Sequence, residues 1–200
     1  MRFYKKYLVG GFVFILACLP AVASLFAEDD PGYEVSFIVE HPFKTVRGEC
    51  GDLSWPGSVL PSIGRSATGE IKLPLPHTIE CAVNSLHTGN ANRDSHMLEV
   101  LQYPLHKVIR ATVTSIGLAK SDPVPGVLHY SITGELEIAG QSRPFQSEVR
   151  TLLSSDGASI NATGIIRVSL SEYGLEAPSL LGISVDDEVE VHYRFLFLVR

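Results

Sequence analysis

The sequence lacks the short motifs that mark the common classes of enzyme. It contains no nucleophile-elbow pattern, no glycine-rich phosphate-binding loop and no metalloprotease helix motif. It also lacks a CxxC pair and the cysteine and histidine spacing of a structural zinc site. These absences weaken the enzyme hypotheses without excluding them, and no motif in the sequence points to a cofactor.

Only one long apolar run is present, and it is too short to cross a membrane. A basic start, the apolar run and small residues at the positions that a signal peptidase reads follow one another: Arg2, Lys5, Lys6, residues 7–19 and residues 21–23. The run is shorter than the roughly 20 residues that a bilayer requires. We therefore predict a signal peptide at residues 1–23, cleavage near Ser24 and a periplasmic or secreted domain over residues 24–200. A lipoprotein box that ends at Cys18 is the alternative.

Basic residues are few and scattered. The chain has 16 Lys and Arg against 22 Asp and Glu, and removal of residues 1–23 leaves 13 against 22, a charge of −9. Binding to nucleic acid needs concentrated positive charge, so we expect no nucleic-acid partner. With 45% hydrophobic and 19% charged residues, the composition fits one globular domain.

Two cysteines, Cys50 and Cys81, remain after removal of the predicted signal peptide. An exported compartment permits a disulfide between them. Two cysteines also commonly lie buried and unpaired in a core. The sequence leaves both arrangements open.

Apolar and polar residues alternate with period two through almost the whole predicted mature chain. The pattern is clearest over residues 33–39, 128–138, 158–170 and 189–199, and it predicts strands with one apolar face each. Turn residues at 121–126, 139–140 and 155–157 suit hairpins rather than crossover helices. Eight or nine such strands of up to 13 residues favour an all-β fold, a single antiparallel eight-stranded barrel.

Two small residues, Ala162 and Gly164, fall on a predicted inward face, which favours a cavity inside the barrel. The stretch SLHTGNANRDSHM, residues 85–97, gathers polar residues between apolar runs. Asn92 or Asp94 is expected to cap a short helix that continues to about Leu101.

Three interpretations of this stretch stay open. It is a structured turn in which Arg93 and Asp94 pair, a contact for the head of a ligand, or a metal or catalytic cluster. The cluster would comprise His41, His87, Asp94 and His96.

Four segments resemble the YceI-like family: VSFIVEHPFKTVRGECGDLSW at 35–55, VNSLHTGNANRDSHMLEVLQYP at 83–104, GELEIAGQSRPF at 134–145, and VSLSEYGL with VDDEVEVHYRF near the end. The resemblance extends over residues 33–199. It implies a lipocalin-like antiparallel β-barrel, usually periplasmic, that holds a long isoprenoid or other amphiphilic lipid. It implies no catalytic activity and leaves the oligomeric state open between a monomer and a homodimer.

The first hypothesis is therefore an exported, non-enzymatic carrier of an isoprenoid-like lipid. His41, Arg93 and His96 are expected to contact the polar head of the ligand. The expected lining of the barrel comprises Phe37, Tyr130, Ile166, Val191 and Phe195. The alternatives are a metal-binding or hydrolytic protein that uses the cluster named above, and a structural stress-response module with a filled barrel.

Overall fold

The computed structural model describes residues 32–40, 43–56, 64–65, 71–72, 74–177, 179–180, 183–184 and 186–199. All of them belong to the second of the two compact units of the chain, Pro31–Arg200. The predicted signal peptide, Cys18, Ser24 and His41 lie outside the described residues. Among the described residues, no helix is long and apolar enough to span a membrane.

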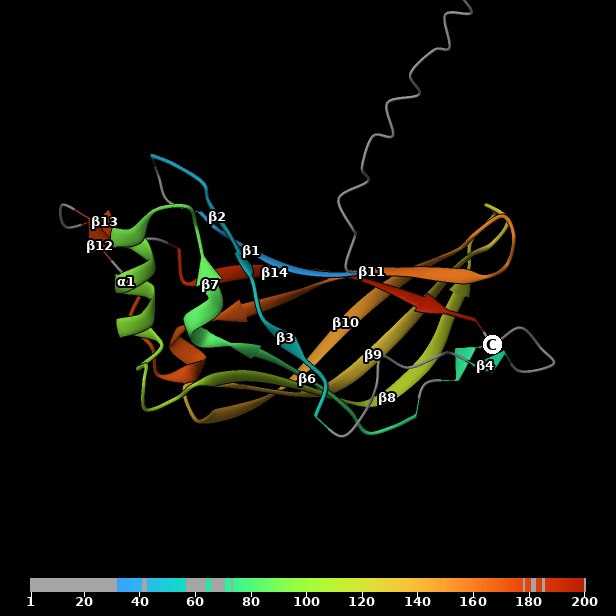
Figure 1. Ribbon diagram of the computed structural model, residues 1–200, viewed down its shortest axis with the longest axis horizontal. Coiled ribbons are helices and arrows are strands. Elements are labelled where there is room, and N and C mark those ends of the chain that lie inside the picture. The colour runs from blue at the N-terminus through green and yellow to red at the C-terminus, as the bar shows by residue number, and fades with distance from the viewer. Residues whose placement is uncertain are drawn as a thin grey trace, which may run out of the picture. The chain divides into compact units, whose positions relative to one another are not determined.

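Antiparallel strands make up most of this unit (Figure 1). The main sheet contains β1 (Tyr33–Val39), β2 (Val46–Cys50), β3 (Leu53–Ser54), β6 (His77–Ala82), β7 (Leu86–His87), β8 (Val108–Ser121), β9 (Val127–Ile138), β10 (Gln141–Leu153), β11 (Ser159–Ser169) and β14 (Glu188–Leu198). Two short hairpins pair β4 (Gly64–Arg65) with β5 (Ile71–Lys72) and β12 (Ser179–Leu180) with β13 (Ile183–Ser184). The helices are η1 (Val83–Ser85), α1 (Ala91–Val100) and η2 (Ser171–Tyr173).

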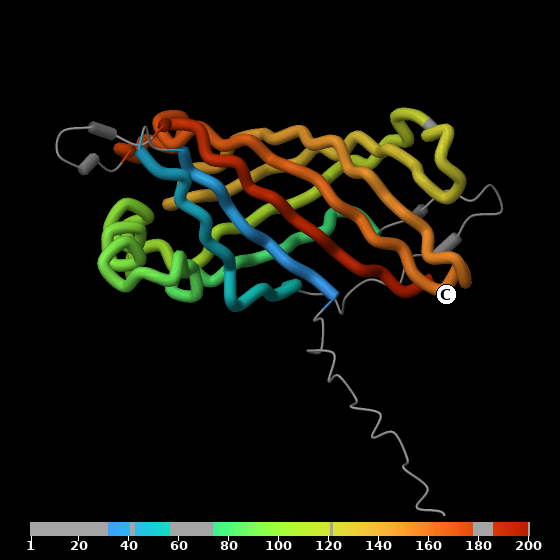
Figure 2. The backbone as a smooth tube through the Cα atoms, turned by 90° about the horizontal axis from the view of Figure 1, so that it is seen from above, coloured from blue at the N-terminus to red at the C-terminus, as the bar shows by residue number. Residues whose placement is uncertain are grey.

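The main sheet is strongly curled, as Figure 2 shows. Its order is β3-β6-β8-β9-β10-β11-β14-β1-β2-β7. The consecutive strands β2 and β3 belong to opposite ends of this order, because β2 pairs with β1 and β3 pairs with β6. One bent segment of chain therefore bridges the two sides of the curled sheet, and the Cys50–Cys81 disulfide joins β2 to β6 beside the bend.

The predicted all-β fold is confirmed, with a different count of strands. Gly51 and Asp52 separate β2 from β3. The amide of Gly51 donates to Ser85 O and the amide of Ala82 donates to Asp52 O, so backbone contacts outside a regular ladder hold the bend. The short strand β7 was not expected. The main sheet has ten strands where eight were predicted.

Tight turns explain how the long strands follow one another. Ala139 and Gly140 both have positive φ angles, of 46° and 74°, and join β9 directly to β10. Such two-residue turns match the twist of a hairpin. In the next turn, Asp156 accepts hydrogen bonds from the hydroxyl of Ser154 and the amide of Ala158. Local turn chemistry therefore sets the predicted order of hairpins.

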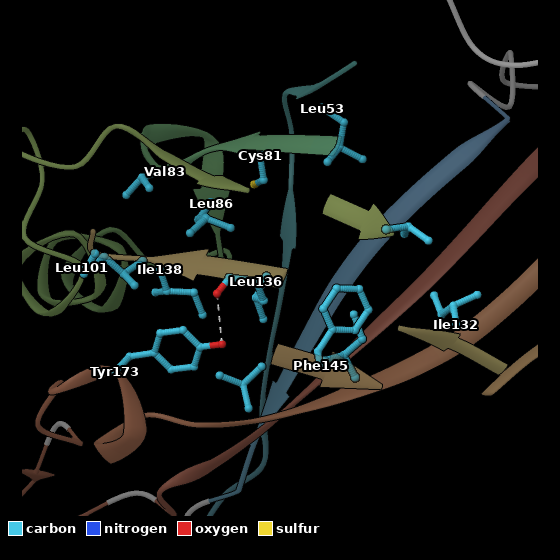
Figure 3. Close-up of a cluster of buried hydrophobic side chains, with 14 of the residues drawn as sticks. Leu53, Cys81, Val83, Leu86, Leu101, Ile132, Leu136, Ile138, Phe145 and Tyr173 are labelled. Atoms are coloured by element: carbon cyan, nitrogen blue, oxygen red, sulfur yellow. Dashed lines mark hydrogen bonds between the residues drawn. The ribbon is translucent and has the colours of Figure 1, made fainter. Parts of the chain in front are cut away.

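Part of the core packs near α1 (Figure 3). Val83, Leu86 and Leu101 gather there, and the side chain of Val83 is only 1% exposed. The hydroxyl of Tyr173, from η2, donates to the carbonyl of Leu136 at 3.3 Å. This packing holds α1 against one end of the curled sheet.

The predicted cap of α1 was wrong by two to four residues. Asn90 is the N-cap, and its side-chain oxygen accepts from the amide of Arg93 at 3.1 Å. Asn90 has extended backbone angles, which place its side chain over the first turn. Asn92 and Asp94 lie inside the helix instead.

Candidate ligand-binding site

A cavity of about 700 Å³ lies inside the curled sheet. Its walls come from β1, β2, β6, β8, β9, β10, β11 and β14, with α1 at one end. Most of the lining is apolar, because the inward face of each strand carries the apolar half of the alternation. The volume falls within the range of roughly 300–1,000 Å³ that is typical of ligand pockets.

Three of the aromatic side chains along the wall of this cavity have a glycine beneath the ring on the neighbouring strand. Three such cross-strand pairs occur: Phe37 with Gly48, Phe145 with Gly134, and Tyr193 with Gly164. A Cβ atom on Gly48 would lie 2.3 Å from Phe37 Cζ, and one on Gly164 would lie 2.2 Å from Tyr193 Oη. No side chain other than hydrogen fits beneath these rings.

This pairing corrects one expectation about the interior. Gly164 was expected to leave open space, but the ring of Tyr193 occupies that space. The hydroxyl of Tyr193 lies 2.9 Å from Ser147 Oγ, which also donates to the carbonyl of Ile165 at 2.8 Å. Burial raises the pKa of Tyr193 to about 12, so the phenol is neutral. Ala162, in contrast, does line the cavity.

Lys44 and the start of α1 line the polar end of the cavity. The adjoining ends of β1 and β2 lie at the same end of the sheet as α1 in Figures 1 and 2. We call this end the rim and define it by Lys44, Thr88, Asn90, Arg93 and His96, all of which line the cavity. No aspartate or glutamate among the described residues lines it. The rim therefore offers two cations and an imidazole in a chain whose net charge is −6.

Thr88 fixes the side chains of Arg93 and Asp94. Its amide and its hydroxyl donate to Asp94 Oδ1 at 2.9 and 2.6 Å. Arg93 Nε donates to the same hydroxyl at 3.1 Å, and Arg93 Nη2 donates to the Thr88 carbonyl at 3.0 Å. The two residues hold the turn through Thr88, which differs from the direct pair that the sequence suggested. Arg93 Nη1 has no partner among the described residues.

The model of the YceI-like domain matches residues 28–197 of this chain. The chain belongs to the YceI-like family. The curled sheet and interior cavity of this YceI-like chain also resemble solved structures. BcnA from Burkholderia cenocepacia is 16% identical, with a TM-score of 0.61 over 82% of this chain and 95% of that chain.

Two further solved structures share the fold. A polyisoprenoid-binding domain from Saccharophagus degradans, implicated in plant cell wall breakdown, is 15% identical, with a TM-score of 0.62 over 84% of this chain and 94% of that chain. A YceI protein from Campylobacter jejuni is 18% identical, with a TM-score of 0.56 over 78% of this chain and 86% of that chain. No curated protein sequence matches the chain.

The YceI-like fold brings most of the expected site residues to one cavity. Phe37, Arg93, His96, Tyr130, Ile166, Val191 and Phe195 all line it. His41 lies outside the described residues. That these side chains contact a ligand stays a prediction.

The proposed metal or catalytic cluster is dispersed. His87 Nε2 lies 2.8 Å from Glu49 Oε1, and its Nδ1 lies 3.1 Å from Ser85 O. Asp94 is held by Thr88, whereas His96 lines the cavity. Within the part of the chain that the structure describes, no three His, Cys, Asp or Glu side chains are placed to share a metal ion.

Several polar residues of the cavity lining were missed in the sequence, among them Lys44 and His77. Lys44 belongs to the β1–β2 connection, where no periodic pattern indicates direction. His77 is the first residue of β6 and shares the inward face with Ile79 and Cys81. Extending the alternation of Ile79 and Cys81 by two residues toward the N-terminus would have assigned His77 to the same inward face.

Proposed function

We propose that this YceI-like protein is a non-enzymatic carrier of an isoprenoid-like amphiphile. The apolar chain of the ligand occupies the cavity, and its polar head lies at the rim. One observation carries this proposal: an apolar cavity of about 700 Å³ has its cationic groups at one end only. A barrel filled by its own side chains would not have a cavity of this size.

The apolar lining supplies the free energy of binding. Each 100 Å² of ligand surface removed from water contributes about 2.5 kcal/mol. The ordering of a flexible chain offsets part of this gain. The hydrophobic contribution has no directional requirement, so the cavity accepts any apolar chain of suitable width and length.

The rim supplies the orientation and the preference for a head group. Lys44 and Arg93 are cations, and Arg93 is already held by its two bonds to Thr88. A preorganised guanidinium binds phosphate or carboxylate oxygens with little further loss of freedom. An anionic head is therefore favoured over a neutral one.

Family membership and the fold shared with the polyisoprenoid-binding domain from Saccharophagus degradans support an isoprenoid chain as the ligand. Export to the periplasm or to the medium is part of the proposal and depends on the signal pattern of residues 1–23.

Geranylgeranyl diphosphate and geranylgeraniol provide a matched test, because they share one chain and differ in the charge of the head. Titration calorimetry on lipid-free protein is expected to show binding of both. The diphosphate should bind on the order of tenfold more tightly, because charge-assisted hydrogen bonds exceed neutral ones.

Variants at the rim distinguish the contribution of the head group to binding from the contribution of the apolar chain. The double variant Lys44→Gln/His96→Gln should reduce the preference for the diphosphate without abolishing it, because Arg93 remains, and should keep its affinity for the alcohol. Lys120→Gln is the matched control, because Lys120 is exposed on β8 and does not line the cavity. If neither geranylgeranyl diphosphate nor geranylgeraniol binds, the proposal is contradicted.

A further inference from the structure

His77 is the one imidazole that lies deep within the described lining of the cavity. Its side chain is turned inward and its residue is only 5% exposed. No hydrogen bond joins either ring nitrogen to another described residue, whereas the hydroxyls of Ser147 and Thr151 in the same interior are bonded to the protein. Because His77 lines the cavity, its imidazole is available to a group inside the cavity.

The surroundings of His77 are apolar. It pairs across the strands with Val113, which pairs with Gly134, and Gly134 pairs with Phe145. The side chains of Val113 and Phe145 both line the cavity at this level, as does Ile79 on the same strand. His77 therefore interrupts an otherwise apolar band of the wall.

His77 is also distant from the rim. Five residue-to-residue steps along β6 lead from His77 to Ala82, the last residue of the strand, which precedes η1. At about 3.3 Å per residue, this is roughly 17 Å along the strand. The head group that contacts Arg93 is therefore a different part of the ligand from the part beside His77.

Burial lowers the pKa of His77 below its ordinary value of 6.5. A neutral imidazole has one N–H donor and one nitrogen acceptor. A plain hydrocarbon chain satisfies neither nitrogen, and it removes any water that could do so. The unmet hydrogen bonds would then count against binding.

We infer that the natural ligand carries a neutral hydrogen-bonding group, a hydroxyl or a carbonyl, within its apolar chain or at its far end, and that this group binds His77. The inference rests on the proposed carrier function and narrows its ligand class. The ligand is an amphiphile with polar groups at two separated positions, an anionic or polar head at the rim and a neutral group at His77.

Positional isomers of one lipid test the inference, because they have equal overall polarity. The probes are octadecanoate and its 2-, 10-, 12- and 17-hydroxy derivatives, titrated into lipid-free full-length protein. The hydroxyl of the 2-isomer lies beside the head, whereas the other isomers carry it down the chain. At least one of these internal isomers should bind on the order of tenfold more tightly than the 2-isomer, the gain from one buried hydrogen bond.

Variants at position 77 test whether His77 causes the preference for the internal hydroxy isomers. His77→Leu should abolish the preference, so that octadecanoate binds as tightly as any internal isomer or more tightly. His77→Gln keeps a donor and an acceptor and should retain part of the preference. His192→Phe is the matched control, because His192 lies on the outer face of β14 beside Glu190, and it should leave the preference unchanged.

The outcomes distinguish this inference from the proposed function. Tight binding of all five probes with equal affinity in wild type and His77→Leu would overturn the inference and leave the carrier proposal intact. A water molecule that satisfies His77 would produce this result. Absence of binding by every probe would overturn both.

Discussion

Substitution of Gly164 by alanine tests how the aromatic rings are held against the wall of the cavity. The new Cβ atom would lie 2.2 Å from Tyr193 Oη, 2.4 Å from Tyr193 Cζ and 2.9 Å from the backbone oxygen of Glu148. These distances are far below van der Waals contact, so the ring of Tyr193 must move. It can move only away from the wall and into the cavity, because the strand backbone lies on its other side.

Two costs follow from this displacement. Overpacking of a well-packed interior costs about 1–3 kcal/mol. Loss of the bond between Tyr193 Oη and Ser147 Oγ, 2.9 Å long, adds about 1 kcal/mol. Gly164→Ala should therefore lower the free energy of unfolding by about 2–4 kcal/mol. It should also weaken the binding of long-chain lipids, since the displaced ring takes up part of the cavity.

Urea denaturation followed by intrinsic fluorescence measures the first effect, and lipid titration measures the second. Gly117→Ala is the matched control, because a Cβ atom on Gly117, also in a strand, meets no atom within 4 Å. This control should be neutral or slightly stabilising. In the double variant Gly164→Ala/Tyr193→Val, the cost should fall short of the sum of the two single costs by at least about 1 kcal/mol. Additive costs, or a Gly164→Ala variant as stable as Gly117→Ala, would refute the reasoning.

Three further predictions concern other parts of the molecule. Cys81→Ser opens a disulfide that closes 31 residues and should cost about 4 kcal/mol in urea denaturation; a cost below about 1 kcal/mol would show that the bond does not constrain the chain. Asn90→Ala removes the N-cap of α1 and should cost about 1 kcal/mol, with Asn92→Ala as a control expected to cost less. Because burial lowers the pKa of His77, the unfolded chain binds its proton more readily than the folded chain. The free energy of unfolding should therefore decrease as the pH falls below 6.5, and it should do so less steeply in His77→Gln. Parallel pH curves for the two proteins would contradict this.

The alternation of apolar residues predicted the wall of the cavity well, because strand periodicity is a local property. Tyr130, Ile166, Val191 and Phe195 fall on inward faces as expected, and all four line the cavity. One interpretation of the polar stretch at residues 85–97 was a structured turn that Arg93 and Asp94 hold. Arg93 and Asp94 do fix that turn, through Thr88.

Features that depend on the pairing of distant strands could not be predicted. The alternation assigns Gly164 and Tyr193 to inward faces, but only the register of β11 with β14 places the ring over the glycine. The register of strands follows from packing across the whole sheet, which no local window contains. The bend at Gly51 and Asp52 has the same origin, because its backbone partners belong to residues 82–85.

The central claim is that the cavity holds a lipid. Native mass spectrometry of protein purified without detergent, before and after extraction with organic solvent, tests it most directly. The account predicts an adduct of defined mass that disappears on extraction, and an extracted compound with an apolar chain and a polar head. Repeated preparations without any adduct, together with a lipid-free protein that takes up no polyprenyl lipid, would contradict it.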